Sequence, residues 1–154
     1  MDENQGIIRE AAAEDAPQLN VCMQKAYMAY EERMKGKRLP PMDVDYEEEI
    51  ASYPVWVIER EGEIIGAVIL TFDPSCTQVA NIAVDPDYQG RGLGRKLLNF
   101  AEQKALDRGY VEMRLATHVL LTENAAFYTS MGWEEVGRDD SRVFFKKSLR
   151  IKGK

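Results

Sequence analysis

The sequence predicts one domain of mixed α and β structure. Segments with helical and strand-like periodicity alternate along 154 residues, a length that suits a single domain with a sizeable core. Between Leu19 and Tyr30, apolar residues recur three and four apart, as on the buried face of a helix. Between Val111 and Leu115 they alternate with polar residues, as in a half-buried strand. No repeat or linker divides residues 1–154, so we expect a single domain.

The first half predicts a strand, two helices and a hairpin. Proline and glycine exclude regular helix between the two helices, and Glu61-Gly62 is a typical two-residue hairpin turn. The expected segments are a strand at Ile7 to Glu10, a helix from Glu14 to about Arg33, a loop from Lys35 to Met42, a short helix from its N-cap Asp43 to about Ala51, and strands Val55 to Glu59 and Glu63 to Thr71.

The second half predicts four strands and two helices. Leu93, Leu97 and Ala101 share one face of a helix that should stop at Gly109, and Gly132 is expected to be a left-handed C-cap. The expected segments are strand Thr77 to Val84, the helix from Leu93, a strand around Val111 to Leu115, a short helix N-capped by Thr122, and strands Trp133 to Gly137 and Arg142 to Lys147.

Composition excludes several classes of protein. The formal net charge of -6 disfavours nonspecific binding to nucleic acid, which needs a basic face. No apolar run is long enough to span a bilayer and no basic-then-apolar leader begins the chain, so we expect a cytoplasmic protein without membrane contact. Cys22 and Cys76 form no motif, and we expect reduced thiols, no metal site and no cysteine nucleophile.

A glycine-rich basic loop lies between the strand that ends at Val84 and the helix from Leu93. It reads Gln89-Gly90-Arg91-Gly92-Leu93-Gly94-Arg95-Lys96. Glycine allows a phosphate close to the backbone, and the positive end of a helix attracts an anion. The loop therefore predicts a phosphate cradle.

Common nucleotide motifs fit this loop badly. A P-loop requires Gly-Lys followed by Ser or Thr, whereas Gly94 precedes Arg95 and Lys96. The dinucleotide fingerprint requires Gly-x-Gly-x-x-Gly, whereas Gly90, Gly92 and Gly94 are spaced Gly-x-Gly-x-Gly.

Two motifs instead carry a resemblance to a known family. Gln89-x-x-Gly92-x-Gly94 resembles the acyl-CoA pyrophosphate motif of the GCN5-related N-acetyltransferase (GNAT) superfamily. Downstream, a shortened form of the second family signature reads Asn124-x-x-Phe127-Tyr128-x-x-x-Gly132-Trp133. The resemblance extends from Ile7 to Leu149. It implies the GNAT fold, an α+β arrangement in which a mostly antiparallel mixed sheet of about six to seven strands is flanked by about four helices.

The resemblance also implies acetyl-CoA as cofactor. In the family, backbone N–H groups of the glycine loop hold the pyrophosphate. A bulge at Ile82 frees backbone groups for the pantetheine arm and for the thioester carbonyl. Tyr128 matches a tyrosine that protonates the departing thiolate, and its alternative role is packing alone. The implied cofactor-binding residues are Ile82, Ala83, Val84, Gln89, Gly90, Arg91, Gly92, Leu93, Gly94, Arg95, Asn124 and Tyr128.

The general base is the least defined part of the site. Some relatives carry a glutamate on the strand before the loop, where this chain has Asn81, which accepts no proton at neutral pH but is able to hold a relaying water. His118, the only histidine, is the candidate base among the side chains, although a lone loop histidine is more often a surface residue. The acidic helix Asp43 to Glu49 is another source of carboxylates, usually a solvated face.

The acceptor is expected to be a primary amine on a small molecule or a peptide, and it would attack the thioester directly in a ternary complex. In the family the first two helices and their loop recognise it, here Tyr27 to Glu49. The tyrosines and carboxylates of this segment favour a cationic amine as the acceptor, whereas its basic residues from Arg33 to Arg38 favour an acidic metabolite. A non-catalytic acyl-CoA-binding module and a nucleotide-binding protein are the alternatives, and a homodimer is compatible with the resemblance.

Overall fold

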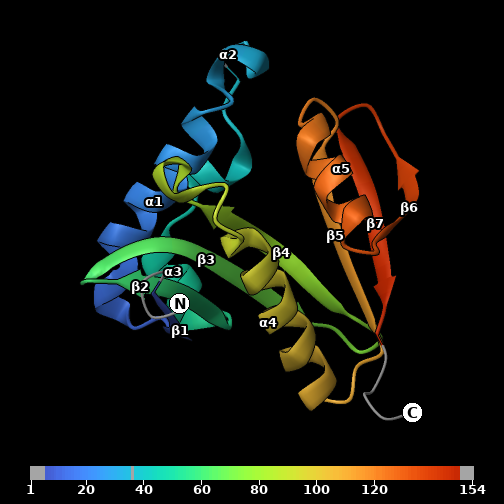
Figure 1. The fold of residues 1–154 in the computed structure, drawn as a ribbon, viewed down its shortest axis with the longest axis horizontal. Helices are drawn as coiled ribbons and strands as arrows, with labels where there is room; N and C mark the ends of the chain where they lie inside the picture. The colour runs from blue at the N-terminus through green and yellow to red at the C-terminus, as the bar shows by residue number, and fades with distance from the viewer. Residues whose placement is uncertain (1–5, 36, 150–154) are drawn as a thin grey trace. The chain divides into compact units, whose positions relative to one another are not determined.

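The computed structural model describes residues 6–35 and 37–149, so Gly36 of the predicted loop lies outside it. Figure 1 shows its helices and strands. In chain order these are β1 (Ile7–Glu10), α1 (Ala16–Met28), α2 (Glu31–Met34), α3 (Tyr46–Ser52), β2 (Val55–Arg60), β3 (Glu63–Phe72), β4 (Thr77–Val84), α4 (Leu93–Asp107), β5 (Glu112–His118), α5 (Thr122–Ser130), β6 (Glu134–Arg138) and β7 (Arg142–Ser148).

The strands are hydrogen-bonded in the order β1-β2-β3-β4-β5-β7-β6. The described ladders are antiparallel except that of β4 with β5, which is parallel at Thr77–Met113 and Gln78–Arg114. This confirms the expected sheet of mixed, mostly antiparallel strands. The described residues hold five α-helices where about four were expected, because the short α2 is separate.

The chain divides into two compact units. The first comprises the described residues up to Leu70 together with Ala80–Leu98, and the second comprises Thr71–Val79 and the described residues from Asn99. The single domain expected from the sequence stays a prediction.

The long helix expected from Glu14 to Arg33 is wrong at both ends. A 3₁₀ turn, Ala13–Asp15, comes first, and α1 begins at Ala16. The helix stops at Met28, because Tyr30 has φ -101° and ψ 3°, and α2 then ends at Lys35 with φ 54°. This turn lets Met34 bury itself, with 5% of its surface exposed, where a straight helix would continue past the core.

Two predicted helix caps are also wrong. Asp45, not Asp43, caps α3, and its Oδ1 accepts the N–H groups of Glu47 and Glu48 at 3.1 and 3.3 Å. The reason is that Pro40–Asp43 forms a 3₁₀ turn of its own, which postpones the next helix. Thr122 is the first residue of α5, so it is not its cap.

The predicted turns at Glu61-Gly62 and Gly132 are confirmed. Glu61 and Gly62 both have positive φ, 50° and 82°, as the tight turn between β2 and β3 requires. Gly132 has φ 94° directly after α5, as expected of a left-handed residue after a helix.

In the first unit, apolar residues of α1 and α3 pack on one face of β2 and β3. The members of this core include Leu19, Cys22, Met23, Tyr46, Val57, Ala67 and Ile69. On β3 the alternate residue Gly66 faces the other way, where a Cβ would come within 3.4 Å of Leu97 Cδ1 and 3.3 Å of the Ala83 carbonyl. The missing side chain therefore lets the start of α4 approach the strands closely.

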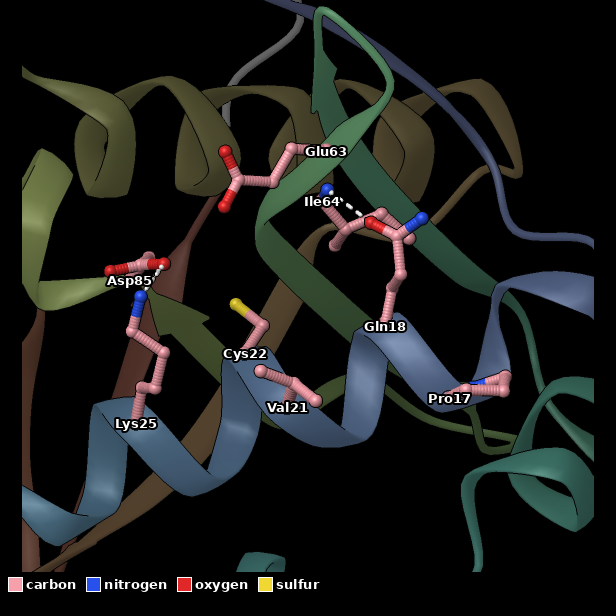
Figure 2. A pocket seen from close by; sticks show the side chains of 8 residues that line it. All are labelled: Pro17, Gln18, Val21, Cys22, Lys25, Glu63, Ile64 and Asp85. Carbon is pink, nitrogen blue, oxygen red and sulfur yellow. Dashed lines mark hydrogen bonds and ion pairs between the residues drawn. The ribbon is translucent and has the colours of Figure 1, made fainter.

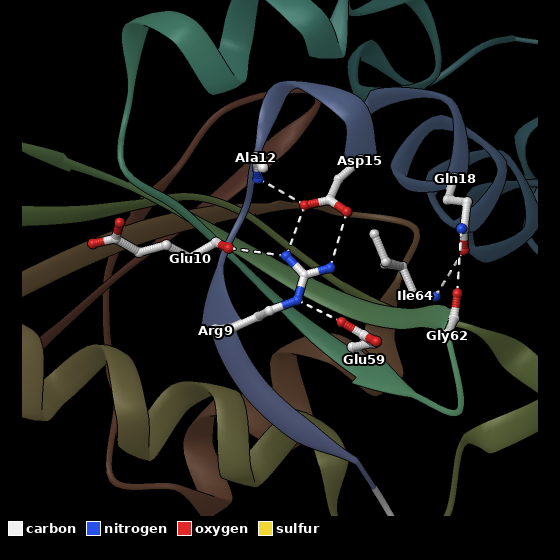
Figure 3. Close-up of polar contacts among 8 residues, drawn as sticks. All are labelled: Arg9, Glu10, Ala12, Asp15, Gln18, Glu59, Gly62 and Ile64. Carbon is white, nitrogen blue, oxygen red and sulfur yellow. Dashed lines mark hydrogen bonds and ion pairs between the residues drawn. The ribbon is translucent and has the colours of Figure 1, made fainter.

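An ion cluster around Arg9 joins β1, β2 and the start of α1 (Figure 3). Its guanidinium donates two parallel hydrogen bonds to Asp15, at 2.8 and 2.9 Å, and a third to Glu59 at 2.6 Å. Asp15 also accepts the N–H of Ala12 at 2.6 Å. The bonds from Arg9 lower the pKa of the Asp15 carboxyl. The cluster thus stabilises the ionised carboxylate at this corner of the first unit.

We expect Asp15→Asn to lower the free energy of unfolding at pH 7 by about 1–2 kcal/mol, because it removes a charge-assisted pair whose arginine is one-third exposed. The folded-state pKa of Asp15 lies below its unfolded value of about 4. Its contribution is therefore complete above that value and is lost as the pH falls through the folded pKa. The free energies of unfolding of wild type and variant should therefore become equal at low pH, and urea unfolding from pH 7 to pH 2 measures them.

Asp43→Asn is the control, since the pair of Asp43 with Arg38 is more than half exposed and its loss should change the stability little. A constant difference across the pH range would contradict the assignment.

Candidate functional site

The glycine loop turns through two glycines in the left-handed conformation. After β4 the chain makes a 3₁₀ turn, Pro86–Tyr88, and reaches α4 through Gly90 and Gly92, both at φ 81°. A Cβ on either glycine would meet nothing within 4 Å. The loop therefore requires glycine for its left-handed conformation, while the space over it stays open for a ligand.

The first turn of α4 points N–H groups at this loop. The N–H of Lys96 donates to the Gly92 carbonyl at 3.0 Å, so the N–H groups of Leu93, Gly94 and Arg95 precede the first α-helical bond. Leu93 is 2% exposed and anchors the turn. A helix of fifteen residues places the positive end of its dipole here, which suits a phosphate.

Two of the basic side chains beside the loop, Lys96 and Arg91, contact other parts of the protein. Lys96 Nζ donates to the Gly6 carbonyl at 3.3 Å, and the Arg91 guanidinium lies 5.2 Å from the centre of the Tyr88 ring. The backbone N–H groups at the start of α4 are therefore the part of the loop that the structure leaves best placed for an anion.

Asp85, which sequence reasoning missed, fixes the start of the loop. This carboxylate is 2% exposed, and its Oδ2 accepts from Lys25 Nζ at 2.8 Å while its Oδ1 accepts the Asp87 N–H at 2.9 Å. Its own N–H donates to the Ile65 carbonyl at 2.9 Å. The Asp-Pro pair after an apolar strand was the available signal, since Asp often bonds the backbone two residues on.

Two carbonyls of the predicted pantetheine segment have protein partners. The Ile82 carbonyl accepts from the Tyr27 hydroxyl at 3.3 Å, and the Val84 carbonyl accepts from Gln89 Nε2 at 3.4 Å. Ala83 is buried between them. The irregularities in the described ladders lie in β2 and β6, and the bulge expected at Ile82 stays a prediction.

Asn81 is held by two tyrosines. Its Oδ1 accepts from the Tyr27 hydroxyl at 2.9 Å, and its Nδ2 donates to the Tyr46 hydroxyl at 3.5 Å. Tyr46 in turn donates to the Pro41 carbonyl at 2.5 Å, and burial raises the pKa of its phenol. The three side chains form a polar network that joins α1, α3 and β4 within the first unit.

Tyr128 and Asn124 lie in the second unit on α5. Tyr128 is 7% exposed, and its ring centre lies 5.8 Å from that of Phe145 and 6.1 Å from that of Trp133. Asn124 Nδ2 donates to Thr117 Oγ1 of β5 at 3.4 Å. Aromatic packing therefore fixes the orientation of Tyr128.

His118 ends β5 with one ring nitrogen engaged. Its Nδ1 accepts the Leu120 N–H at 3.1 Å, so the neutral ring carries its proton on Nε2. A proton could be accepted only at Nδ1, after loss of this bond. The geometry thus counts against His118 as a base, and that role stays a prediction.

The described residues support neither a metal site nor a cysteine nucleophile. Between residues 6 and 149, Gly36 apart, no three His, Cys, Asp or Glu side chains are grouped to hold a metal ion. Both thiols are free and buried. Burial and the Asp85 carboxylate raise the pKa of Cys22 to about 12, and burial raises that of Cys76. In the part of the chain that the structure describes, no helix has the length and hydropathy to cross a membrane.

We expect the Cys22 thiol to react with Ellman's reagent at pH 8 more slowly than an unfolded thiol by a factor on the order of 10³, because so little of it is thiolate. Cys76→Ser isolates the Cys22 signal, and the same variant in urea provides the unfolded rate. Equal rates in the two states would show an exposed or activated thiol.

Comparison with known proteins is consistent with this geometry. Residues 23–133 match the model of the Acetyltransferase (GNAT) family. An uncharacterized N-acetyltransferase of Escherichia coli, YjgM, is 28% identical over 109 residues, which cover 66% of this chain and 65% of that protein. Human N-acetyltransferase 8B is 29% identical over 95 residues, or 58% of this chain, so the chain spans only 42% of its length.

Solved structures show the same fold. The PaiA N-acetyltransferase of Thermoplasma acidophilum in complex with coenzyme A has a TM-score of 0.78 at 19% identity, over 93% of this chain and 98% of that one. The ribosomal-protein-S18-alanine N-acetyltransferase of Escherichia coli has a TM-score of 0.74 at 22% identity, over 96% of each chain. Because the family model matches residues 23–133, which is more than half of the chain, this chain belongs to the acetyltransferase (GNAT) family.

Proposed function

We propose that the chain is an N-acetyltransferase that transfers the acetyl group of acetyl-CoA to a primary amine. The observation that carries the proposal is the glycine loop, in which Gly90 and Gly92 at positive φ lead into the first turn of a long helix. Family membership supports the same cofactor.

The proposed cofactor contacts follow the two motifs. N–H groups of the loop bind the pyrophosphate, and the backbone from Ile82 to Val84 binds the pantetheine arm. Asn124 hydrogen-bonds the cofactor. The pyrophosphate segment comprises Gln89, Gly90, Arg91, Gly92, Leu93, Gly94 and Arg95.

The proposed reaction is direct attack. The neutral amine attacks the thioester carbonyl, a C–N bond forms, and the C–S bond breaks as the tetrahedral intermediate collapses. Tyr128 gives its proton to the departing thiolate, since a phenol of pKa near 10 is matched to a slightly weaker base. An acetyl-enzyme on Cys22 is disfavoured because that thiol stays protonated.

The proton lost by the amine has no carboxylate acceptor at position 81. We propose that a water bound at the Asn81 amide relays it, and His118 is the alternative. A binding module without turnover is the second candidate function, and Asn81 in place of a glutamate is the observation that favours it.

The proposed acceptor is a cationic amine recognised by the segment from Tyr27 to Glu49. This segment contains the tyrosines of the Asn81 network and the acidic helix α3. Arg38 is already paired with Asp43 at 2.8 Å, which lessens the case for an acidic metabolite. Thiol release from acetyl-CoA against polyamines, aminoglycosides, amino acids and lysine peptides tests the proposal. Cytoplasmic residence and a homodimer stay predictions.

Gly92→Glu should abolish CoA binding, because a carboxylate then occupies the phosphate site. Gly109→Glu is the matched control, since Gly109 also has positive φ, 87°, with nothing within 4 Å of a Cβ, but lies beyond the C-terminal end of α4. Both variants carry backbone strain of about 1–2 kcal/mol, so a shared loss of stability is expected. Calorimetry with CoA measures the difference, and equal affinities in the two variants would remove the phosphate-cradle argument.

Tyr128→Phe should lower kcat by about 10²-fold or more while the KM for acetyl-CoA changes little, because only proton donation is lost. Phe127→Leu is a packing control on the same helix. Steady-state thiol release measures both constants. Unchanged turnover in Tyr128→Phe would leave Tyr128 with a packing role alone.

A further inference from the structure

A second ion pair between a lysine and a carboxylate holds the C-terminal end of α5. In the first unit, Lys25 and Asp85 fix the start of the glycine loop (Figure 2). In the second unit, the Lys147 ammonium of β7 donates to the Glu102 carboxylate of α4 at 2.9 Å and to the Met131 carbonyl at 2.7 Å. Met131 directly follows α5, so this one ammonium joins α4, β7 and the end of α5.

The end of a helix is a favourable place for an ammonium. The last carbonyls of an α-helix lack partners within the helix, and this end carries a negative partial charge. The lysine stem reaches the Met131 carbonyl beside Gly132, where a Cβ would lie 3.4 Å from Lys147 Cε. Only 20% of the Lys147 side chain and 17% of the Glu102 side chain are exposed, so water competes little for either charge.

The same turn contains Tyr128. Its carbonyl accepts the N–H groups of Met131 and Trp133, both at 3.0 Å. Tyr128 is therefore bonded to the residue whose carbonyl Lys147 binds. The Tyr128 ring packs on Phe145, which lies two residues before Lys147 and so faces the same side of β7. One face of β7 thus holds both the backbone and the ring of Tyr128.

The position of α5 depends on contacts of this kind. The helix has nine residues, and a helix this short is marginal by itself. A general acid must lie within hydrogen-bond reach of its acceptor, and a misplacement on the order of 1 Å costs as much as 10²-fold in rate. Asn124, the proposed cofactor contact on the same helix, has its own bond to Thr117. Loss of the Lys147 contact should therefore affect turnover more than cofactor binding.

We propose that Lys147 is a positioning residue for Tyr128. Its ammonium holds the Met131 carbonyl, Glu102 holds the ammonium, and the two together fix the turn from which the phenol projects. This role of Lys147 rests on the proposed role of Tyr128 as the acid. It gives the ion pair a function in the reaction beyond its contribution to stability.

The first test measures the environment of Tyr128 without turnover. In protein labelled with 3-fluorotyrosine, the Tyr128 signal is the ¹⁹F resonance that Tyr128→Phe removes. Lys147→Met removes the ammonium but keeps most of the stem, and it should move this resonance by more than its line width. Lys146→Met is the matched control, because it makes the same change in charge on the opposite face of β7 and should leave the resonance in place.

The second test is steady-state thiol release. Lys147→Met should lower kcat by about tenfold and change the KM for acetyl-CoA less than about twofold. In the Tyr128→Phe background the same substitution should lower kcat less than about twofold, because the proton donation that it supports is already lost. Lys147→Arg keeps a charged donor and should retain kcat within about threefold of wild type.

Three results would overturn the proposal: an unmoved Tyr128 resonance, equal effects of the Lys146 and Lys147 variants, or the same loss of kcat with and without the Tyr128 hydroxyl. Urea unfolding checks that each variant is folded under the assay conditions. If Lys147→Met does not fold, Glu102→Gln takes its place in both tests, because it loosens the ammonium without removing it. Failure of the proposed acetyltransferase function would instead appear as a wild type without thiol release, and the ¹⁹F test of Lys147 would still decide its role.

Discussion

The buried carboxylate of Asp85 is the constraint on which the glycine loop depends. It is 98% buried as a side chain and would be costly there without partners, and Lys25 and the Asp87 N–H supply them. These bonds tie α1 to the turn that begins the loop, while the Asp85 N–H ties the same residue to β3. The loop therefore starts from a fixed point, and its glycines need only turn the chain into α4. Rigid presentation of N–H groups is what anion binding requires, because a preformed site loses little entropy when it is filled.

The network around Asn81 also fixes a polar side chain by hydrogen bonds from neighbouring elements. The Tyr27 hydroxyl bonds both the Asn81 amide and the Ile82 carbonyl, so it orients a side chain and the adjacent backbone together. An amide suits this position because it accepts from one tyrosine and donates to the other, whereas a carboxylate has nothing to donate to Tyr46. Asn81 thus fits a positioning role, and that role is consistent with a water, rather than a side chain, as the proton acceptor.

Features determined by a few adjacent residues were predictable from the sequence. The Glu61-Gly62 turn and the left-handed Gly132 after α5 depend on local backbone preferences, and both are found where the sequence predicted them. The break after Met28 and the cap at Asp45 depend on where Met34 becomes buried and where a 3₁₀ turn ends, which no local pattern records. Lys25 and Asp85 are 60 positions apart, so no local sequence motif could predict that they form an ion pair. Topology came from the family resemblance, since periodicity alone gives only mixed α and β.

An acidic net charge does not conflict with the proposed anion site, because the relevant charges are local. The net charge of -6 acts over distances at which salt screens it, with a Debye length of about 8 Å at physiological ionic strength. At the loop itself the positive potential comes from N–H groups at the start of α4, which need no basic side chain. This separation explains why Lys96 can bind the Gly6 carbonyl and Arg91 can lie over Tyr88 without weakening the argument for a pyrophosphate cradle.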